Sequence, residues 1–186
     1  MELKKILGKI HEEQLETFST ISEFRQRKHT KILPIKHRGL YWIWAKLSYA
    51  ELKEIKNKPN SKEVPIAKLV DLRFNLKNIC NIFNGDYKII YNGIGGYNKT
   101  PASFGLRERI NQELNCNDYR TGTLNLLNRN VHHEVNNWAI SFFDFDDENN
   151  YDIINCFNTQ EPYIDYANII ETNWRIEYGF PILNRY

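Results

Sequence analysis

Apolar residues recur along this chain with two different periods, and the changes of period divide it into predicted elements. Three short runs rich in aromatic and β-branched residues predict strands at 39–44, 87–92 and 138–143. Apolar residues three or four positions apart predict helices at 1–28, 48–55, 66–83, 106–114 and 162–178. Ser48 and Glu51 form a capping-box pattern at the start of the second of these helices.

The order of these elements predicts an α/β fold. We expect a small three-stranded sheet, mixed or antiparallel, flanked by helices. The length of 186 residues suits one domain with a proper core. Residues 1–38 are predicted to be an N-terminal helical extension, and residues 39–186 the main domain with a helical insertion at 45–86.

Composition narrows the class of protein. Hydrophobic residues make up 41% and charged residues 26%, which is ordinary for a globular protein. The longest apolar runs, 39–45 and 138–143, fall far short of the roughly 18 residues that a membrane helix needs, and the charged N-terminus is no signal peptide. Cys80, Cys116 and Cys156 are widely spaced, which favours reduced thiols in the cytoplasm and argues against a zinc knuckle.

Charge is distributed unevenly. Residues 1–90 carry 18 Lys and Arg against 10 Asp and Glu, a net +8, while residues 91–186 carry 7 against 13, a net −6. Such an asymmetry fits a protein that grips a polyanion and holds a cation nearby, although a chance spread over a solvated surface gives the same count.

The stretch from Tyr91 to Ile110 carries the strongest local pattern. A predicted strand runs into Asn92-Gly93 and Gly95-Gly96, where the backbone can turn without a Cβ penalty, and then into a helix that carries Arg109. The pattern brings a phenol and a fixed cation together, and this pair suits phosphodiester chemistry.

Taken together, several short motifs resemble, in order, those of the GIY-YIG nuclease family. They are Gly39-Leu40-Tyr41, Tyr91-Asn92-Gly93, Arg109 within Leu106-Arg-Glu-Arg-Ile110, Glu171, and Pro181-Ile-Leu-Asn184. The resemblance spans residues 39–184. It implies a divalent-metal-dependent endonuclease that hydrolyses DNA, works as a homodimer if the cut site is palindromic, and has no membrane partner.

The resemblance also implies roles for the matched residues. Glu171 would hold one Mg²⁺ or Mn²⁺ on the scissile phosphate, and Arg109 would stabilise the charge that gathers there. Tyr41 would accept the proton of the attacking water, Tyr91 would orient water or phosphate, and Asn184 would steady the site. A phenol has a pKa of about 10, so we expect Arg109 and the metal to favour its phenolate form.

Basic residues near these motifs are the expected contacts to DNA phosphates. The residues of this set are His37, Arg38, Lys53, Lys56, Lys58, Lys99 and Arg107.

The chain departs from the family pattern at three places. The two tyrosine motifs, which a short hairpin usually joins, lie 50 positions apart here. Asn92 replaces the usual aliphatic residue. Glu113 stands four residues after Arg109, where many members have a tyrosine or histidine, so a third proton-handling group is in doubt.

Other interpretations stay open at this point. Residues 93–100 nearly match a phosphate-binding P-loop, with Asn98 in place of its second glycine, and a nucleotide hydrolase would use Asp144 for magnesium. A nuclease-shaped module that only binds DNA is a further alternative. The acidic loop with Asp144, Asp146 and Asp147 competes with Glu171 for the metal. We reject a His-Asn-His site at 132–134, because no histidine follows His133.

Overall fold

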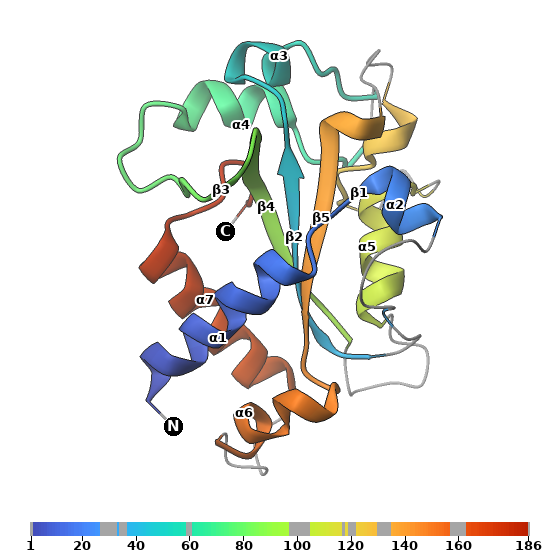
Figure 1. Cartoon of the computed structure of the whole chain (residues 1–186). Coiled ribbons are helices and arrows are strands. Elements are labelled where there is room, and N and C mark those ends of the chain that lie inside the picture. Colours follow the sequence, from blue (N-terminus) through green and yellow to red (C-terminus); the bar gives the residue numbers. More distant parts are fainter. Residues whose placement is uncertain are drawn as a thin grey trace.

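A five-stranded antiparallel sheet forms the centre of this computed structural model (Figure 1), in the order β1-β5-β2-β4-β3. The strands are β1 (Ser19–Thr20), β2 (Gly39–Ala45), β3 (Phe83–Asn84), β4 (Tyr87–Gly95) and β5 (Trp138–Asp144). The structure describes residues 2–26, 33, 37–58, 61–96, 105–116, 118, 122–129, 135–156 and 163–185.

The expected three-stranded sheet is therefore wrong in its strand number. The three long strands lie where the sequence predicts them, and two edge strands, β1 and β3, complete the sheet. Each edge strand has two residues, which is too short for any periodic signal. Their pairing depends on neighbours that lie next to them only in the folded chain.

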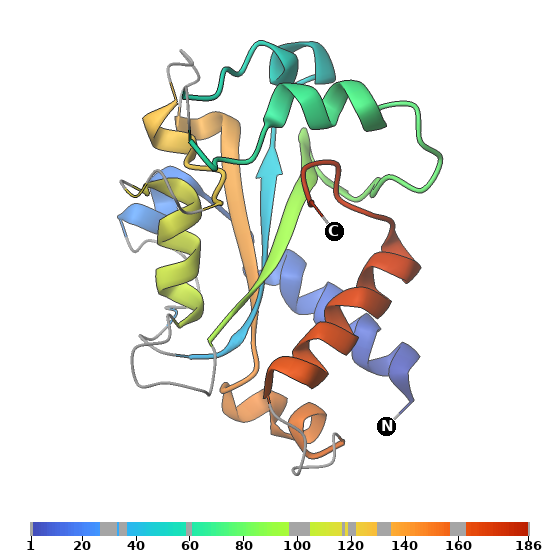
Figure 2. The same ribbon diagram turned by 180° about the vertical axis from the view of Figure 1, so that it is seen from behind.

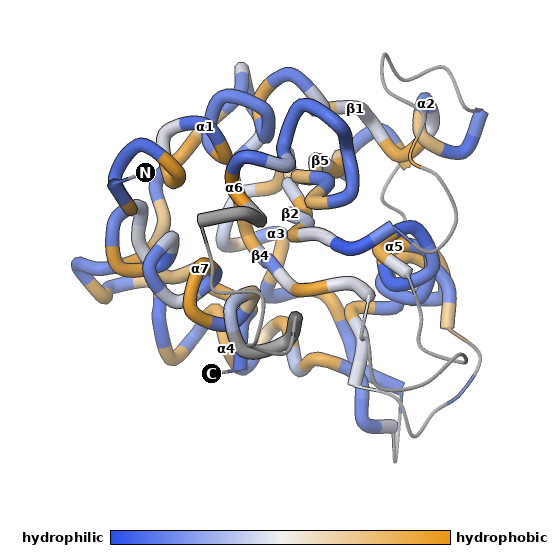
Figure 3. Tube along the Cα trace, turned by 90° about the horizontal axis from the view of Figure 1, so that it is seen from below, coloured by the Kyte–Doolittle hydropathy of each residue, from blue (hydrophilic) through white to orange (hydrophobic). Residues whose placement is uncertain are grey.

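Helices cover both faces of the sheet (Figures 1 and 2). α1 (Leu3–Glu16) and α7 (Tyr163–Tyr178) lie on one face, while α2 (Ile21–Arg25) and α5 (Leu106–Leu114) lie on the other. The view from below shows the strands between these two layers (Figure 3). Two helices, α3 (Tyr49–Lys53) and α4 (Ile66–Arg73), belong to the segment between β2 and β4, and α6 (Tyr151–Cys156) follows β5. Short 3-10 turns occupy Leu126–Asn128, Val135–Asn137 and Glu148–Asn150.

The first predicted helix, 1–28, is wrong in its extent. α1 ends at Glu16, and after β1 the side chain of Thr20 caps α2 in a reciprocal capping box with Glu23. The N-terminal segment thus adds a strand to the same sheet. The helix predicted at 66–83 is also too long, since α4 ends at Arg73. The capping box of Ser48 and Glu51 is confirmed.

β2 is buried along its whole length because it lies between β4 and β5 and is covered on both faces. Tyr41 and Ile43 pack in the core on the α5 side, whereas Trp42 and Trp44 pack against α1 and α7. This arrangement explains the continuous apolar run, which lacks the polar alternation of a half-exposed strand.

The free edge of β4 is covered by the C-terminal segment (Figure 2). The Leu183 backbone N–H donates to the carbonyl of Ile90, and Asn184 follows it along the same edge. Pairing of this kind satisfies edge groups that would otherwise be open. Among the described residues, no helix combines the length and the apolar character that crossing a membrane requires.

Candidate active site

Tyr41 and Tyr91 lie on neighbouring antiparallel strands and on the same face of the sheet. In the register, Tyr41 is opposite Gly93 and Tyr91 is opposite Ile43, and the two phenol ring centroids are 6.2 Å apart. A Cβ at Gly93 would approach the Tyr41 hydroxyl oxygen to 2.4 Å. Glycine is therefore required at position 93 because the Tyr41 side chain crosses directly over that residue.

α5 packs very close to these strands. A Cβ at Gly95 would approach the Leu106 Cα to 2.4 Å, so the start of the helix lies almost against β4. The Leu106 backbone N–H donates to the carbonyl of His37 at 2.7 Å, which fixes the helix start beside β2. With Leu106 and Ile110 buried, Arg109 and Glu113 are directed at the tyrosines.

Glu113 is the centre of this cluster. Its side chain is fully buried, and Oε1 accepts a hydrogen bond from the Tyr41 hydroxyl at 2.8 Å and another from Arg109 Nη2 at 3.1 Å. Oε2 accepts from the Leu124 backbone N–H at 2.7 Å. Three donors therefore converge on one carboxylate, and this is the arrangement expected of its ionised form.

Burial controls the proton affinities here. It raises the pKa of Tyr41 well above the usual value, and the Glu113 carboxylate raises it further, against a smaller opposing effect of Arg109. Burial also raises the pKa of Tyr91 and that of Glu113. Although burial alone would lower the pKa of Arg109, the neighbouring acidic groups raise it. Arg109 does lower the pKa of Tyr41, as the sequence leads us to expect. Burial and the Glu113 carboxylate raise that pKa by more, so the net shift is upward.

A second cluster lies on the other side of β4, around Asn92. The Asn92 side chain donates to Glu171 Oε1 at 3.1 Å and accepts from Arg175 Nε at 3.1 Å. Arg175 Nη2 is itself 2.9 Å from Glu171 Oε1. Asn184 is bound to the Asn92 backbone in both directions, since its Oδ1 accepts the N–H at 3.0 Å and its Nδ2 donates to the carbonyl at 2.7 Å.

The two clusters adjoin through consecutive residues of β4. Tyr91 belongs to the first and Asn92 to the second, and the Glu171 carboxylate contributes to the raised pKa of Tyr91. α7 positions Glu171 by burying Ile170 and Trp174 against the sheet. The structure thus places Tyr41, Tyr91 and Arg109 in one cluster and Glu171 and Asn184 in another, and the two clusters adjoin in the middle of β4, at Tyr91 and Asn92.

A divalent cation at this cluster would have one buried carboxylate as its ligand, Glu171, whose Oε1 already binds Asn92 and Arg175. Burial raises the pKa of Glu171, and Arg175 opposes this shift. Across the described residues, no three His, Cys, Asp or Glu side chains gather closely enough to form a metal cage. Mg²⁺ commonly binds through one or two carboxylates with water and substrate phosphate oxygens as its other ligands. One buried carboxylate, Glu171, matches that habit.

Three of the six expected DNA contacts that the structure describes are engaged within the protein. His37 Nδ1 is 2.8 Å from Asp144 Oδ2, Arg38 binds Asp146 through its side chain and backbone, and Lys53 Nζ is 2.7 Å from Asp71 Oδ1. The side chains of Lys56 and Lys58 are exposed and Arg107 is half-buried, while Lys99 lies outside the described residues.

The structure also describes parts of the two alternative sites, namely the acidic loop that could bind a metal and the glycine-rich stretch that could bind a nucleotide. Asp144 and Asp146 are held in ion pairs, and Asp147 caps the turn at Glu148–Asn150. Gly93 and Gly95 are paired residues within β4, not members of a loop that follows it. Two of the glycines that a P-loop would use to bind phosphate are thus part of the sheet, which argues against the nucleotide-binding interpretation.

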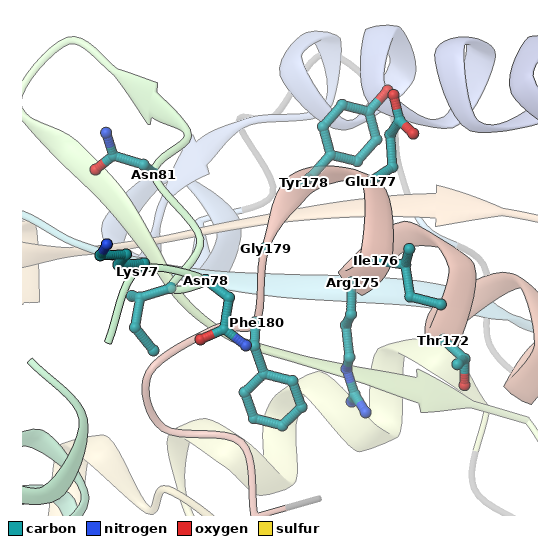
Figure 4. Close-up of a pocket in the computed structure, with 11 residues that line it drawn as sticks. Lys77, Asn78, Asn81, Thr172, Arg175, Ile176, Glu177, Tyr178, Gly179 and Phe180 are labelled. Atoms are coloured by element: carbon teal, nitrogen blue, oxygen red, sulfur yellow. The ribbon is translucent and has the colours of Figure 1, made fainter. Parts of the chain in front are cut away.

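A hollow of about 620 Å³ lies beside the second cluster, between the C-terminal end of α7 and the segment 77–81 (Figure 4). Arg175 lines it and also binds Glu171, which does not itself line the hollow. The guanidinium carbons of Arg175 and Arg73 lie 5.2 and 5.3 Å from the Phe180 ring centroid. Lys77 and Asn78 line the opposite side.

Three contributors to the site were not assigned from sequence. The sequence leaves the role of Glu113 in doubt, marks Asn92 only as a departure from the family pattern, and gives Arg175 no role. The four-residue spacing of Arg109 with Glu113, and of Glu171 with Arg175, is a signal that could have revealed two helical ion pairs. The bonds of Asn92 depend on tertiary structure and leave no such signal.

Comparison with known proteins gave no match to a family model, a curated protein or a solved structure.

Proposed function

We propose that this protein is a divalent-metal-dependent endonuclease that hydrolyses phosphodiester bonds in DNA. The observation that supports the proposal is the meeting of Tyr41, Tyr91 and Arg109 around one buried carboxylate, with Glu171 and Asn184 joined at the next residue of β4. These residues come from five different segments of the chain. A scaffold with no chemistry to perform has little reason to bury a phenol and two carboxylates so close to a second phenol and a guanidinium, since each buried polar group is costly to desolvate.

In this proposal Glu171 holds Mg²⁺ or Mn²⁺. When bound, the cation polarises the scissile phosphate and stabilises the leaving 3′ oxygen. Asn92 and Arg175 both bind Oε1 of Glu171, and so they fix the carboxylate in one orientation. Asn184 acts indirectly, because it holds the β4 backbone at Asn92 and through it the side chain that binds Glu171.

Arg109 supplies positive charge beside the phosphate as water attacks. Its guanidinium is anchored by Glu113 and by Gln112, whose Oε1 accepts from Nη1 at 2.7 Å. Tyr91, which is half-exposed, orients the water or the phosphate, and Tyr41 accepts the proton. A preorganised cation of this kind stabilises developing charge without reorganisation during the reaction.

DNA is the proposed partner, and a palindromic cut site would call for a homodimer. The exposed Lys56 and Lys58 are retained as phosphate contacts. We place the protein in the cytoplasm, in agreement with the free thiols of Cys80 and Cys116.

A second candidate is a module of the same shape that binds DNA without cutting it. The observation that favours it is the complete burial of Tyr41, whose hydroxyl is already bonded to Glu113. Supercoiled plasmid incubated with the purified chain and Mg²⁺ or Mn²⁺ separates the two functions. Metal-dependent nicked or linear product, with mapped 5′-phosphate ends, supports the endonuclease. Retardation of the plasmid without any cleavage supports the binding module.

A further inference from the structure

Three aromatic rings and two lysines are in contact at the end of the sheet where α3, α4 and the turn between β3 and β4 lie (Figures 1 and 2). The Lys88 ammonium lies 4.8 Å from the centroid of the Tyr49 ring and 5.5 Å from that of the Phe83 ring. The Lys53 ammonium lies 4.3 Å from the centroid of the Phe74 ring. Tyr49 and Lys53 are four positions apart on α3, which makes them neighbours on one side of that helix. These five residues form one series, which we call the ring–lysine surface.

The rings of this surface are open to solvent. Phe83 is 52% exposed and Phe74 is 42% exposed. A hollow of about 470 Å³ is lined by Tyr49, Phe83 and Lys88, so there is space for a ligand against two of the rings. Apolar side chains scattered singly over a surface are ordinary, whereas exposed rings that gather in one place mark an interaction surface.

The two lysines hold the rings in place. The Lys88 ammonium donates to the Tyr49 hydroxyl at 2.6 Å, and the Lys53 ammonium lies 2.7 Å from Asp71 Oδ1. Because both charges are engaged within the protein, the binding groups that this surface offers are its rings. Aromatic rings bind flat partners by stacking, and every nucleobase has a face on which a ring can stack.

The charge around the rings complements a polyanion. The segment 46–88, which contains the whole ring–lysine surface, carries 9 Lys and Arg against 5 Asp and Glu, a net +4. The exposed Lys56 and Lys58 directly follow α3. A nucleic acid has both the flat groups and the negative backbone that these features match. In a duplex the faces of the bases are covered by the neighbouring base pairs, so only an unpaired strand offers them for stacking.

We propose that the ring–lysine surface binds the unpaired bases of a single DNA strand by stacking on Phe74 and Phe83, while Lys56 and Lys58 contact its phosphates. The surface lies apart from the candidate active site but close to it, since Lys88 precedes Tyr91 on β4 by three residues, about 10 Å along the strand. The choice of DNA over RNA rests on the proposed function. The stacking itself requires neither a metal nor cleavage.

The test is fluorescence anisotropy in EDTA with three probes: an oligothymidylate of about 20 nucleotides, an abasic strand with the same number of phosphates, and a duplex of the same length. Phe74→Ala and Phe83→Ala should each weaken oligothymidylate binding about 5- to 100-fold, the loss of one stacked base, and should change binding of the other two probes less than about twofold. The slope of log K against log salt should stay the same, because a ring neutralises no phosphate.

The controls separate stacking from folding. Phe83→Trp keeps a ring and should bind oligothymidylate like wild type, and Phe83→Leu keeps an apolar side chain without a ring and should bind like Phe83→Ala. Tyr151 is also 52% exposed, but it lies on α6 at the opposite end of the sheet, so Tyr151→Ala should bind like wild type (Figure 1). Thermal unfolding of each variant shows that its fold is kept.

Outcomes that overturn the inference are distinct from those that overturn the proposed function. Equal losses for all three probes, or ring variants that bind oligothymidylate like wild type, exclude stacking on this surface. Tighter ring-dependent binding of an oligouridylate excludes the assignment to DNA. A protein that binds as predicted but leaves plasmid uncut in Mg²⁺ is no endonuclease and still has this surface. A protein that cuts plasmid without ring-dependent binding is an endonuclease that lacks it.

Discussion

The hydroxyl of Tyr41 on β2 donates to the carboxylate of Glu113 on α5 at 2.8 Å, although the two residues are 72 positions apart in the chain. Both side chains are fully buried. This bond ties α5 to β2 and links the fold to the proposed chemistry.

The position of the Tyr41 side chain, which crosses over β4, predicts a strict need for glycine at position 93. Gly93→Ala places a methyl group 2.4 Å from the Tyr41 hydroxyl oxygen, and both strands are held by their pairing. The free energy of unfolding should fall by about 1–3 kcal/mol, as for other overpacked cores. Urea denaturation measures it.

Gly8→Ala is the control for this change. Gly8 lies in α1 with nothing within 4 Å of an added Cβ, so alanine there should stabilise the protein by up to about 1 kcal/mol. Equal effects of the two substitutions would show that the packing of Tyr41 over Gly93 is unimportant.

The elements that have a periodic apolar pattern are predictable from the sequence. The features that depend on contacts of single residues are not. The long strands and the helix that carries Arg109 were recoverable, because each has a periodic apolar pattern. The break between α1 and α2 was not, since Thr20 and Glu23 look like ordinary helical residues until β1 pairs with β5.

The candidate site shows the same division. Tyr41, Tyr91, Arg109, Glu171 and Asn184 are all named from ordered motifs, and the structure places them in two clusters that adjoin at Tyr91 and Asn92. The contacts that organise them were not foreseen. Glu113 receives bonds from β2 and from Leu124, and Asn92 reaches α7 and Asn184, so neither role is encoded in local spacing.

Asn92 is predicted to position Glu171 through its side chain alone. Asn92→Leu removes the bonds to Glu171 and Arg175 but keeps the backbone bonds to Asn184. We expect cleavage to fall while unfolding free energy drops by about 1–3 kcal/mol. Asn92→Asp should reduce cleavage and stability further, because it places a second carboxylate beside that of Glu171. Asn173→Ala, on the exposed side of α7, is the control, and cleavage by Asn92→Leu at the same rate as this control would contradict the assignment.

Salt dependence should distinguish among the lysines expected to contact DNA. Lys53 is already paired with Asp71, whereas Lys56 and Lys58 are exposed. The joint change of Lys56 and Lys58 to alanine should lower the slope of log K against log salt by about 2, since each neutralised phosphate contributes about 0.9. Lys53→Ala should leave the slope unchanged. Fluorescence anisotropy between 50 and 200 mM salt measures it, and a slope unchanged in the double variant would remove these residues from the interface.

The buried thiol of Cys80 predicts a loss of stability at alkaline pH. Burial raises its pKa to about 11, whereas an unfolded thiol ionises near 8.5. The unfolded state therefore loses its proton first, and stability falls as pH rises from about 8.5 to about 11. The loss should approach about 3 kcal/mol.

Denaturation of wild type and Cys80→Ala across this pH range checks the prediction. The variant should show the shallower decline, and Cys116→Ser, at a half-exposed position, should follow wild type. In the native protein at pH 8, peptide mapping after alkylation should find Cys116 modified and Cys80 protected. Parallel declines of wild type and Cys80→Ala would show that Cys80 does not control this pH dependence.

The most direct test of the proposed endonuclease is Glu171→Gln beside Glu177→Gln. Both residues lie on α7, but Glu171 is buried at the cluster and Glu177 is exposed. Plasmid cleavage is measured in Mg²⁺ and in EDTA, with DNA binding measured in parallel. The account predicts that Glu171→Gln keeps its fold and its DNA binding but loses metal-dependent cleavage, while Glu177→Gln cuts like wild type. Cleavage by Glu171→Gln at the wild-type rate, or wild-type cleavage that persists in EDTA, would contradict it.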